Sequence, residues 1–138
     1  MSRRLVLDAE AVSSLGNPSS EGFEHVRAAL TAADRLGRDV VVTCVTLAEL
    51  YQGKNRSQIV DAMLSREAGV ALRDTDRSFA RLVGGVLVAA GAGSDLLADA
   101  HAVAAAVEVG GGVILTSDVD DLERLAAPYP NIQISKIQ

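Results

Sequence analysis

The stretch Ser94–Leu122, SDLLADAHAVAAAVEVGGGVILTSDVDDL, decides the fold that we expect for this chain. It opens with a run rich in Ala, Val and Leu over 96–109, which predicts a helix whose first turn Ser94 would cap. Three glycines at 110–112 would end this helix, because glycine readily adopts the left-handed conformation found at helix ends. The apolar run Val113–Leu115 then predicts a strand buried on both faces, and an acidic loop follows it.

The rest of the chain repeats this alternation of strand and helix. Short β-prone runs at 4–7, 39–42, 69–72 and 132–134 are separated by segments in which apolar residues recur at helical spacing. This pattern predicts an α/β fold with a central, mainly parallel β-sheet of four to five strands and helices on both faces. The length of 138 residues suits a single domain over 1–138 with a sizeable core.

Composition indicates a globular protein of a reducing compartment. Nearly half of the residues are apolar, and the one cysteine, Cys44, lies in the apolar segment VVVTCVT, which predicts a buried, inert thiol. Only three apolar residues precede Asp8 near the amino terminus, too few for a signal peptide, and no run approaches the length of a membrane-spanning helix. We therefore expect a cytoplasmic protein without a membrane partner.

Acidic residues stand where the predicted sheet would place a ligand. Asp8 ends the first predicted strand and Asp118 follows the strand at 113–115, and ligands of parallel α/β sheets bind beyond the carboxyl ends of the strands. Asp99 lies in the apolar helical run, where an unpaired carboxylate is costly. Glu49 lies in another helical segment that could border the same crevice. These four acids are the candidate site.

A divalent cation would relieve the repulsion among several carboxylates in one cleft. Mg²⁺ and Mn²⁺ prefer oxygen ligands, and an all-carboxylate site of this kind suits phosphoryl transfer, in which the metal activates water. Zinc is disfavoured because the only two histidines, His25 and His101, are far apart and no cysteine cluster exists. We expect His101 to be a partly exposed helix residue.

The net charge of −5 does not exclude a nucleic-acid partner. The chain has 18 acidic and 13 basic residues, so setting aside five acids at the candidate site leaves 13 of each. Those five are Asp8, Glu49, Asp99, Asp118 and Asp120. Outside one acidic pocket the chain would be neutral, and a divalent metal in that pocket could still engage phosphate.

Four segments together resemble the acidic motifs of PIN-domain ribonucleases in order and spacing. They are VLDAEAV at 6–12, VTLAELYQG at 45–53, SDLLADAHAVAAA at 94–106 and ILTSDVDDL at 114–122. The size is similar to that of single-domain PIN toxins of the VapC kind, from toxin–antitoxin pairs. The resemblance implies a Mg²⁺- or Mn²⁺-dependent endoribonuclease that is usually homodimeric and is inhibited by a small cognate antitoxin protein.

The resemblance also implies roles for individual residues. The catalytic and metal-binding acids would be Asp8, Glu49, Asp99 and Asp118. Thr116 would hold a metal-bound water or orient Asp118, and Asp95 and Asp120 would act in an outer shell. Lys54 and Arg56 follow the Glu49 segment and could meet RNA phosphates. Which of Asp118, Asp120 and Asp121 reaches the metal stays open, although Asp118 is favoured because it lies two residues after Thr116.

Other classes of protein fit the sequence less well. A phosphoacceptor receiver domain also clusters acids at strand ends, and Lys136 is a late lysine, but no strand–Asp unit stands where the acceptor should be. A phosphatase with an Asp-x-Asp nucleophile motif would need a second Asp where Glu10 stands. A PIN-fold binding module that has lost catalysis remains as an alternative, against which the complete set of four acids speaks.

Overall fold

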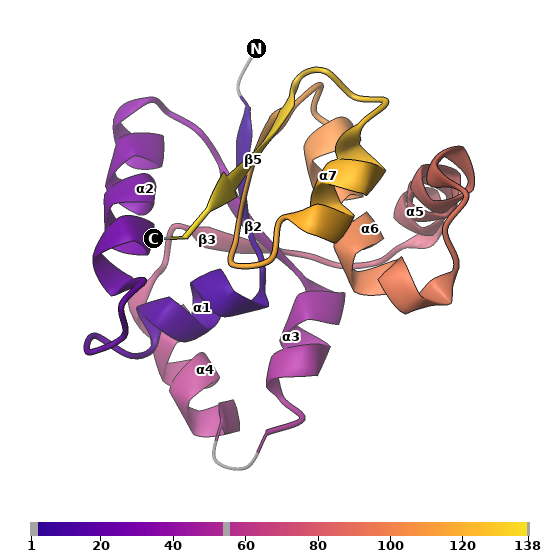
Figure 1. Ribbon diagram of the computed structural model, residues 1–138. Helices are drawn as coiled ribbons and strands as arrows, with labels where there is room; N and C mark the ends of the chain where they lie inside the picture. The colour runs from indigo at the N-terminus through magenta and orange to yellow at the C-terminus, as the bar shows by residue number, and fades with distance from the viewer. Residues whose placement is uncertain (1–2, 54–55, 138) are drawn as a thin grey trace.

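A single parallel sheet forms the centre of the molecule, as the computed structural model shows for the residues it describes, 3–53 and 56–137. Five strands lie in the order β3-β2-β1-β4-β5, and every neighbouring pair is parallel (Figure 1). Their bounds are β1 Arg4–Leu7, β2 Val40–Thr43, β3 Val70–Arg73, β4 Gly112–Thr116 and β5 Ile132–Lys136. The predicted α/β class with a parallel sheet is confirmed, with five strands.

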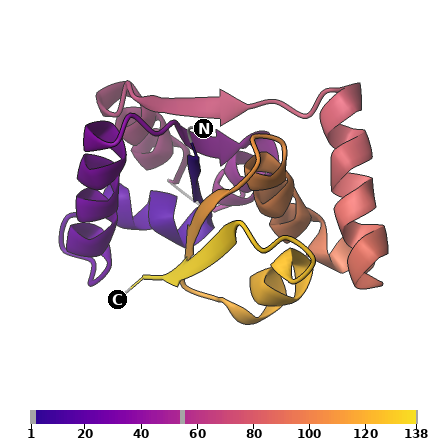
Figure 2. The ribbon, with the colours of Figure 1, turned by 90° about the horizontal axis from the view of Figure 1, so that it is seen from above.

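Helices cover both faces of the sheet (Figure 2). One face carries α1 Ala9–Leu15, α2 Phe23–Arg35, α3 Cys44–Leu50 and α4 Arg56–Arg66; the other carries α5 Arg77–Ala90, the 3-10 turn η1 Ser94–Leu96, α6 Leu97–Val107 and α7 Asp120–Ala126. The central strand β1 serves both layers because side chains alternate along a strand. Leu5 and Leu7 pack with the first group of helices, and Val6 packs with the second.

The helix before β4 begins later than the sequence predicts. The predicted helix at 96–109 is η1 followed by α6, so Ser94 lies inside the 3-10 turn, three residues before α6, and does not cap that helix. The glycine stop is confirmed: Gly110 and Gly111 have φ of 86° and 143°, and the Gly111 N–H donates to Ala106 O at 2.9 Å. The chain thereby turns directly into β4.

Two further expectations are wrong. His101 is only 4 % exposed, because α6 packs its imidazole between the Leu97 carbonyl at 2.8 Å and the Thr75 hydroxyl at 3.1 Å. Cys44 is half-buried, because it opens α3 at the end of β2, where its Sγ donates to an oxygen of Asp74 at 2.9 Å. This contact raises the pKa of the Cys44 thiol.

The strand order creates one place where a crevice can open. From β1 the chain moves outward to β2 and β3, and it then returns across the sheet to place β4 on the other side of β1. The point between β1 and β4 is a topological switch point, where connections leave in opposite directions and ligands of such sheets bind. Figure 1 shows α1, α3 and the start of α6 gathered at this lower edge of the sheet.

Candidate metal centre

Asp8 is held rigidly at the switch point. It follows β1 directly, and its N–H donates to the Leu115 carbonyl of the neighbouring β4 at 3.1 Å. One carboxylate oxygen accepts from the Ala9 N–H at 2.8 Å, which makes Asp8 the N-cap of α1. The other oxygen accepts from the Thr116 hydroxyl, also at 2.8 Å. Both oxygens are therefore oriented by the ends of two adjacent strands.

Thr116 links Asp8 to the turn that carries Asp118. Thr116 lies at the end of β4 and is only 1 % exposed. Its hydroxyl donates to Asp8 and accepts from the Asp118 N–H at 3.1 Å. This is a local side-chain turn of the kind that Thr forms with the backbone two residues on. The Asp118 side chain itself is exposed. Thr116 thus orients both acids through one hydroxyl group.

Asp99 lies half-buried in the first turn of α6 and is the most perturbed acid of the site. Burial raises the pKa of the Asp99 carboxyl to about 6, and the negative charges of nearby acids add to the effect. In decreasing order of effect, these acids are Asp8, Asp121, Glu49 and Asp118. Since no cation of the described residues is among the groups that act on it, the ionised form of Asp99 has no compensating charge within that part of the chain.

Glu49 approaches the group from α3, which follows β2. Thr43 ends that strand and caps α3, accepting from the Thr46 N–H at 3.3 Å. Glu49 is exposed, yet partial desolvation and the charge of Asp8 both raise the pKa of its carboxyl. The structure therefore brings Asp8, Glu49, Asp99 and Asp118 within electrostatic reach of one another, from four separate elements.

Asp121 belongs to the same group; from the sequence it was one of three acids, with Asp118 and Asp120, among which the choice of metal ligand stayed open. It lies in the first turn of α7 beside Asp120, and its charge acts on Asp99 more strongly than that of Glu49 or Asp118. Asp95 and Asp120 are exposed, and neither is among the acids that act on Asp99.

Two cations, Lys54 and Arg56, were expected to meet RNA phosphates. Lys54 lies outside the described residues, and Arg56 is described only as the first residue of α4, without its side chain. Their role stays a prediction.

The acids fit a hydrated divalent cation. All the donors are carboxylate oxygens, the type that Mg²⁺ and Mn²⁺ prefer, and the crowding that raises the pKa of Asp99 is the repulsion that such an ion would remove. Over 3–53 and 56–137, no three His, Cys, Asp or Glu side chains are already arranged to hold an ion directly. Ligation partly through water, which Mg²⁺ commonly retains, suits this looser spacing.

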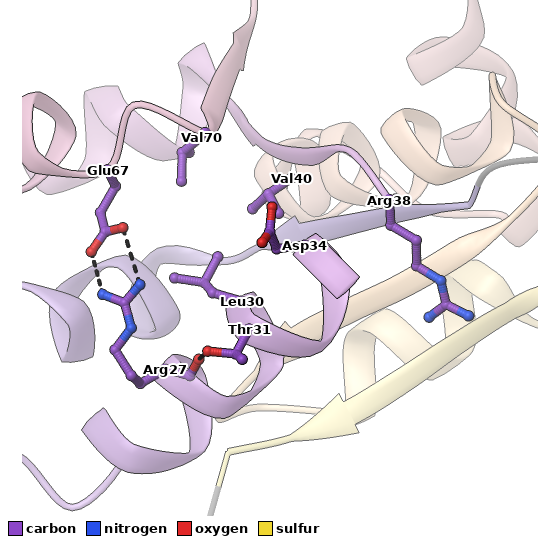
Figure 3. Close-up of a pocket in the computed structure, with 9 residues that line it drawn as sticks. Arg27, Leu30, Thr31, Asp34, Arg38, Val40, Glu67 and Val70 are labelled. Atoms are coloured by element: carbon purple, nitrogen blue, oxygen red, sulfur yellow. Dashed lines mark hydrogen bonds and ion pairs between the residues drawn. The ribbon is translucent and has the colours of Figure 1, made fainter. Parts of the chain in front are cut away.

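A hollow of about 280 Å³ lies elsewhere, at the amino ends of β2 and β3 (Figure 3). Figure 3 shows that Arg27 faces Glu67, with which it forms a bidentate ion pair. Arg38 points away from that pair. Because its facing charges already neutralise each other, this hollow offers none of the uncompensated charge of the carboxylate group.

The geometry defines a class: a doubly wound α/β domain with a carboxylate cluster at the switch point of its sheet. The chain belongs to the PIN domain family, whose model matches residues 5–128. No curated protein matches the chain as a whole. Over the described residues, no helix has the length and apolar character needed to cross a membrane.

Solved structures share the fold across nearly the whole chain. A chain of VapBC2 from Rickettsia felis, bound to a promoter DNA fragment, superposes with a TM-score of 0.66 at 18 % identity, covering 98 % of this chain and 99 % of that one. A chain of DNA-bound VapBC from Salmonella typhimurium superposes with a TM-score of 0.64 at 18 % identity, and the match covers 100 % of each chain. A chain of VapBC-1 from nontypeable Haemophilus influenzae superposes with a TM-score of 0.56 at 18 % identity, covering 96 % of this chain and 97 % of that one.

Proposed function

We propose that this protein is a Mg²⁺- or Mn²⁺-dependent endoribonuclease, the toxin of a toxin–antitoxin pair of the VapC kind. The observation that carries the proposal is the raised pKa of Asp99, about 6, in a group of acids on which no cation within 3–53 and 56–137 is seen to act. A structural carboxylate would be paired or fully solvated. An acid that is neither is expected where a metal ion binds.

The residues that would hold the ion are Asp8, Asp99 and Asp118, with Glu49 at the border of the group. When bound, the ion would orient and activate water and stabilise the negative charge that develops on phosphorus. Asp8 needs little rearrangement for this role, because Thr116 and the Ala9 N–H already orient its carboxylate, and Thr116 also holds the backbone at Asp118. Thr116 is thus a positioning residue. Asp121 would add negative charge from α7, and Asp95 and Asp120 would act further out.

RNA is the proposed substrate, in a single-stranded or looped form. The acid group lies at an exposed edge of the sheet: Glu49, Asp118 and Asp121 are all exposed, so a flexible strand can reach it. Lys54 and Arg56 follow the α3 helix that carries Glu49, and they would contact phosphates. We place this activity in the cytoplasm.

The proposed protein partners are a small cognate antitoxin and a second copy of the chain. The structural neighbours come from VapBC assemblies, which supports the first. The uncompensated negative charge at the site supports an inhibitor that presents cationic groups to it.

The test is cleavage of a panel of structured RNAs by purified protein in Mg²⁺, in Mn²⁺ and in EDTA. We expect cleavage in either metal and none in EDTA. Asp99→Asn should abolish it, whereas the matched control Asp95→Asn, four residues earlier and exposed, should retain most of it. Equal cleavage by Asp99→Asn and wild type would refute the proposal; metal binding without cleavage of any RNA would favour the silent binding module.

A further inference from the structure

A second hollow, of about 300 Å³, lies directly beside the acid group, on the α1 side of the sheet. Its walls come from α1, from the loop before α2 and from the ends of β4 and β5. The polar residues that line it are Glu10, Ser14, Ser20, Glu21 and Ser117. Every charged group among its lining residues is an acid, so the hollow would repel phosphate and favour a neutral group rich in hydrogen-bond donors.

Ser14 indicates that this hollow is prepared for a ligand. The residue is only 7 % exposed, and its hydroxyl has no hydrogen-bond partner among the described residues. Ser20 donates to the Ser14 carbonyl at 3.3 Å and leaves the Ser14 hydroxyl free. The hydroxyl is not sealed from solvent, so it can be satisfied through the hollow by water or by a ligand that replaces the water.

Gly22 keeps the space next to that hydroxyl open. A Cβ at position 22 would lie 2.8 Å from Ser14 Oγ and 2.5 Å from a methyl carbon of Ile137. Glycine is therefore required here by close packing, since its φ of −83° is open to any residue. The hollow also has two free acceptors, because neither Glu10 nor Glu21 has a partner among the described residues.

None of the four site acids lines the hollow, but two of its lining residues, Glu10 and Ser117, are close neighbours in the chain of Asp8 and Asp118. Glu10 lies two residues after Asp8, and Ser117 lies between Thr116 and Asp118. The Ile137 N–H donates to the Thr116 carbonyl at 2.8 Å, so the wall formed by Ile137 is fastened to the residue that orients Asp8 and Asp118. A strand whose phosphate lies at the acids would place a neighbouring base at this hollow.

We propose that this hollow binds a guanine base next to the scissile phosphate, an inference that rests on the proposed ribonuclease function. Guanine presents two adjacent donors, N1–H and the N2 amino group, on its Watson–Crick edge, and a carboxylate accepts both at once. Glu10 or Glu21 provides that carboxylate, and the Ser14 hydroxyl completes the set. Adenine presents a donor beside an acceptor on that edge, and the acceptor would oppose a carboxylate oxygen.

The experiment compares single-stranded RNA oligonucleotides that carry one guanine, or inosine in its place, at each position around the cleaved bond. Inosine lacks only the N2 amino group. We expect wild-type kcat/KM to be about tenfold to a hundredfold higher with guanine at one position, the range for a lost hydrogen bond to a charged acceptor. Ser14→Ala should bring the guanine-to-inosine ratio of kcat/KM close to one. One of the two variants Glu10→Gln and Glu21→Gln, the one that removes the acceptor, should do the same.

Glu24→Gln is the matched control, because Glu24 is an exposed acid of α2 that does not line the hollow. It reports the general gain in RNA affinity from losing one negative charge, and its guanine-to-inosine ratio should equal that of wild type. Fluorescence anisotropy with the same oligonucleotides in EDTA measures base preference without cleavage, so a protein that cuts no RNA still tests the hollow.

A wild-type ratio near one in both assays would overturn the proposal, and so would a ratio that survives all three substitutions. If the hollow instead binds a cationic side chain of a partner protein, the wild-type guanine-to-inosine ratio will be near one in both assays. Guanine preference in binding without cleavage would refute the nuclease and keep the base site.

Discussion

Replacing Asp99 by Asn should stabilise the metal-free protein, and the effect should depend on pH. Moving the pKa of a carboxyl from 3.8 to about 6 makes its ionised form unfavourable in the folded state by about 3 kcal/mol. Asp99 is only half-buried, so solvent screening reduces this to on the order of 1–2 kcal/mol. In a domain of this size, such a gain raises the melting temperature by about 3 to 8 °C.

The sign follows from the two pKa values. Below pH 3.8 the carboxyl is protonated in both folded and unfolded chains and costs nothing. Between 3.8 and about 6 the unfolded chain ionises first, so stability falls as pH rises, and above about 6 the full penalty is present. The Asn variant escapes this loss, so its advantage should be large at about pH 7.5 and small at about pH 4.

Urea unfolding in EDTA at these two pH values measures the effect, with Asp95→Asn as the control for removing one nearby charge. Saturating Mg²⁺ should reverse the order, because the ion stabilises wild type by about 2.7 kcal/mol at a hundred times its Kd and the variant by less. Equal stability of Asp99→Asn and wild type at about pH 7.5 in EDTA, or an advantage unchanged at about pH 4, would refute the electrostatic reasoning.

Substitutions at three further positions test the hydrogen bonding and packing of the fold. Thr116→Val removes the hydroxyl that donates to Asp8 and should cost about 1–3 kcal/mol in urea unfolding, together with most RNA cleavage, whereas Thr116→Ser should restore both. Gly112→Ala would bring a Cβ to 2.3 Å from the Arg4 carbonyl oxygen, and we expect a loss of about 3 kcal/mol or more by the same measurement. Gly85→Ala meets nothing within 4 Å inside α5 and should instead stabilise the chain by about 0.5–1 kcal/mol; a melting temperature below that of wild type would contradict this.

Much of the architecture could be predicted because its signals are local. The three glycines and the apolar run that follow α6 predicted β4 to within a residue at each end, and all five strands were anticipated. Asp8 and Asp118 could be placed at the same edge of the sheet, because the carboxyl ends of parallel strands lie together and ligands bind beyond them. Asp99 on α6 stood out because its apolar helical setting makes an unpaired carboxylate costly, and the family resemblance added the roles of Asp99 and Glu49.

The rest depended on packing that no local pattern encodes. Ser94 is a good capping residue, yet a 3-10 turn displaced it from the start of α6. His101 looks like a surface residue, but α5 covers it and Phe79 packs edge-on against its ring at 5.7 Å. Asp121 could not be separated from Asp120 until the orientation of α7 was known, because both stand in the same helical turn.

The pairing of β1 with β4 has a consequence for the moment at which the acid group first assembles. Arg4 pairs with Gly112 and Leu7 with Leu115, so the innermost hydrogen bonds of the sheet join segments more than a hundred residues apart. Contacts of such long range form late in folding. Both segments must therefore leave the ribosome before Asp8 and Asp118 can meet, so the acid group cannot assemble while β4 is still inside the exit tunnel.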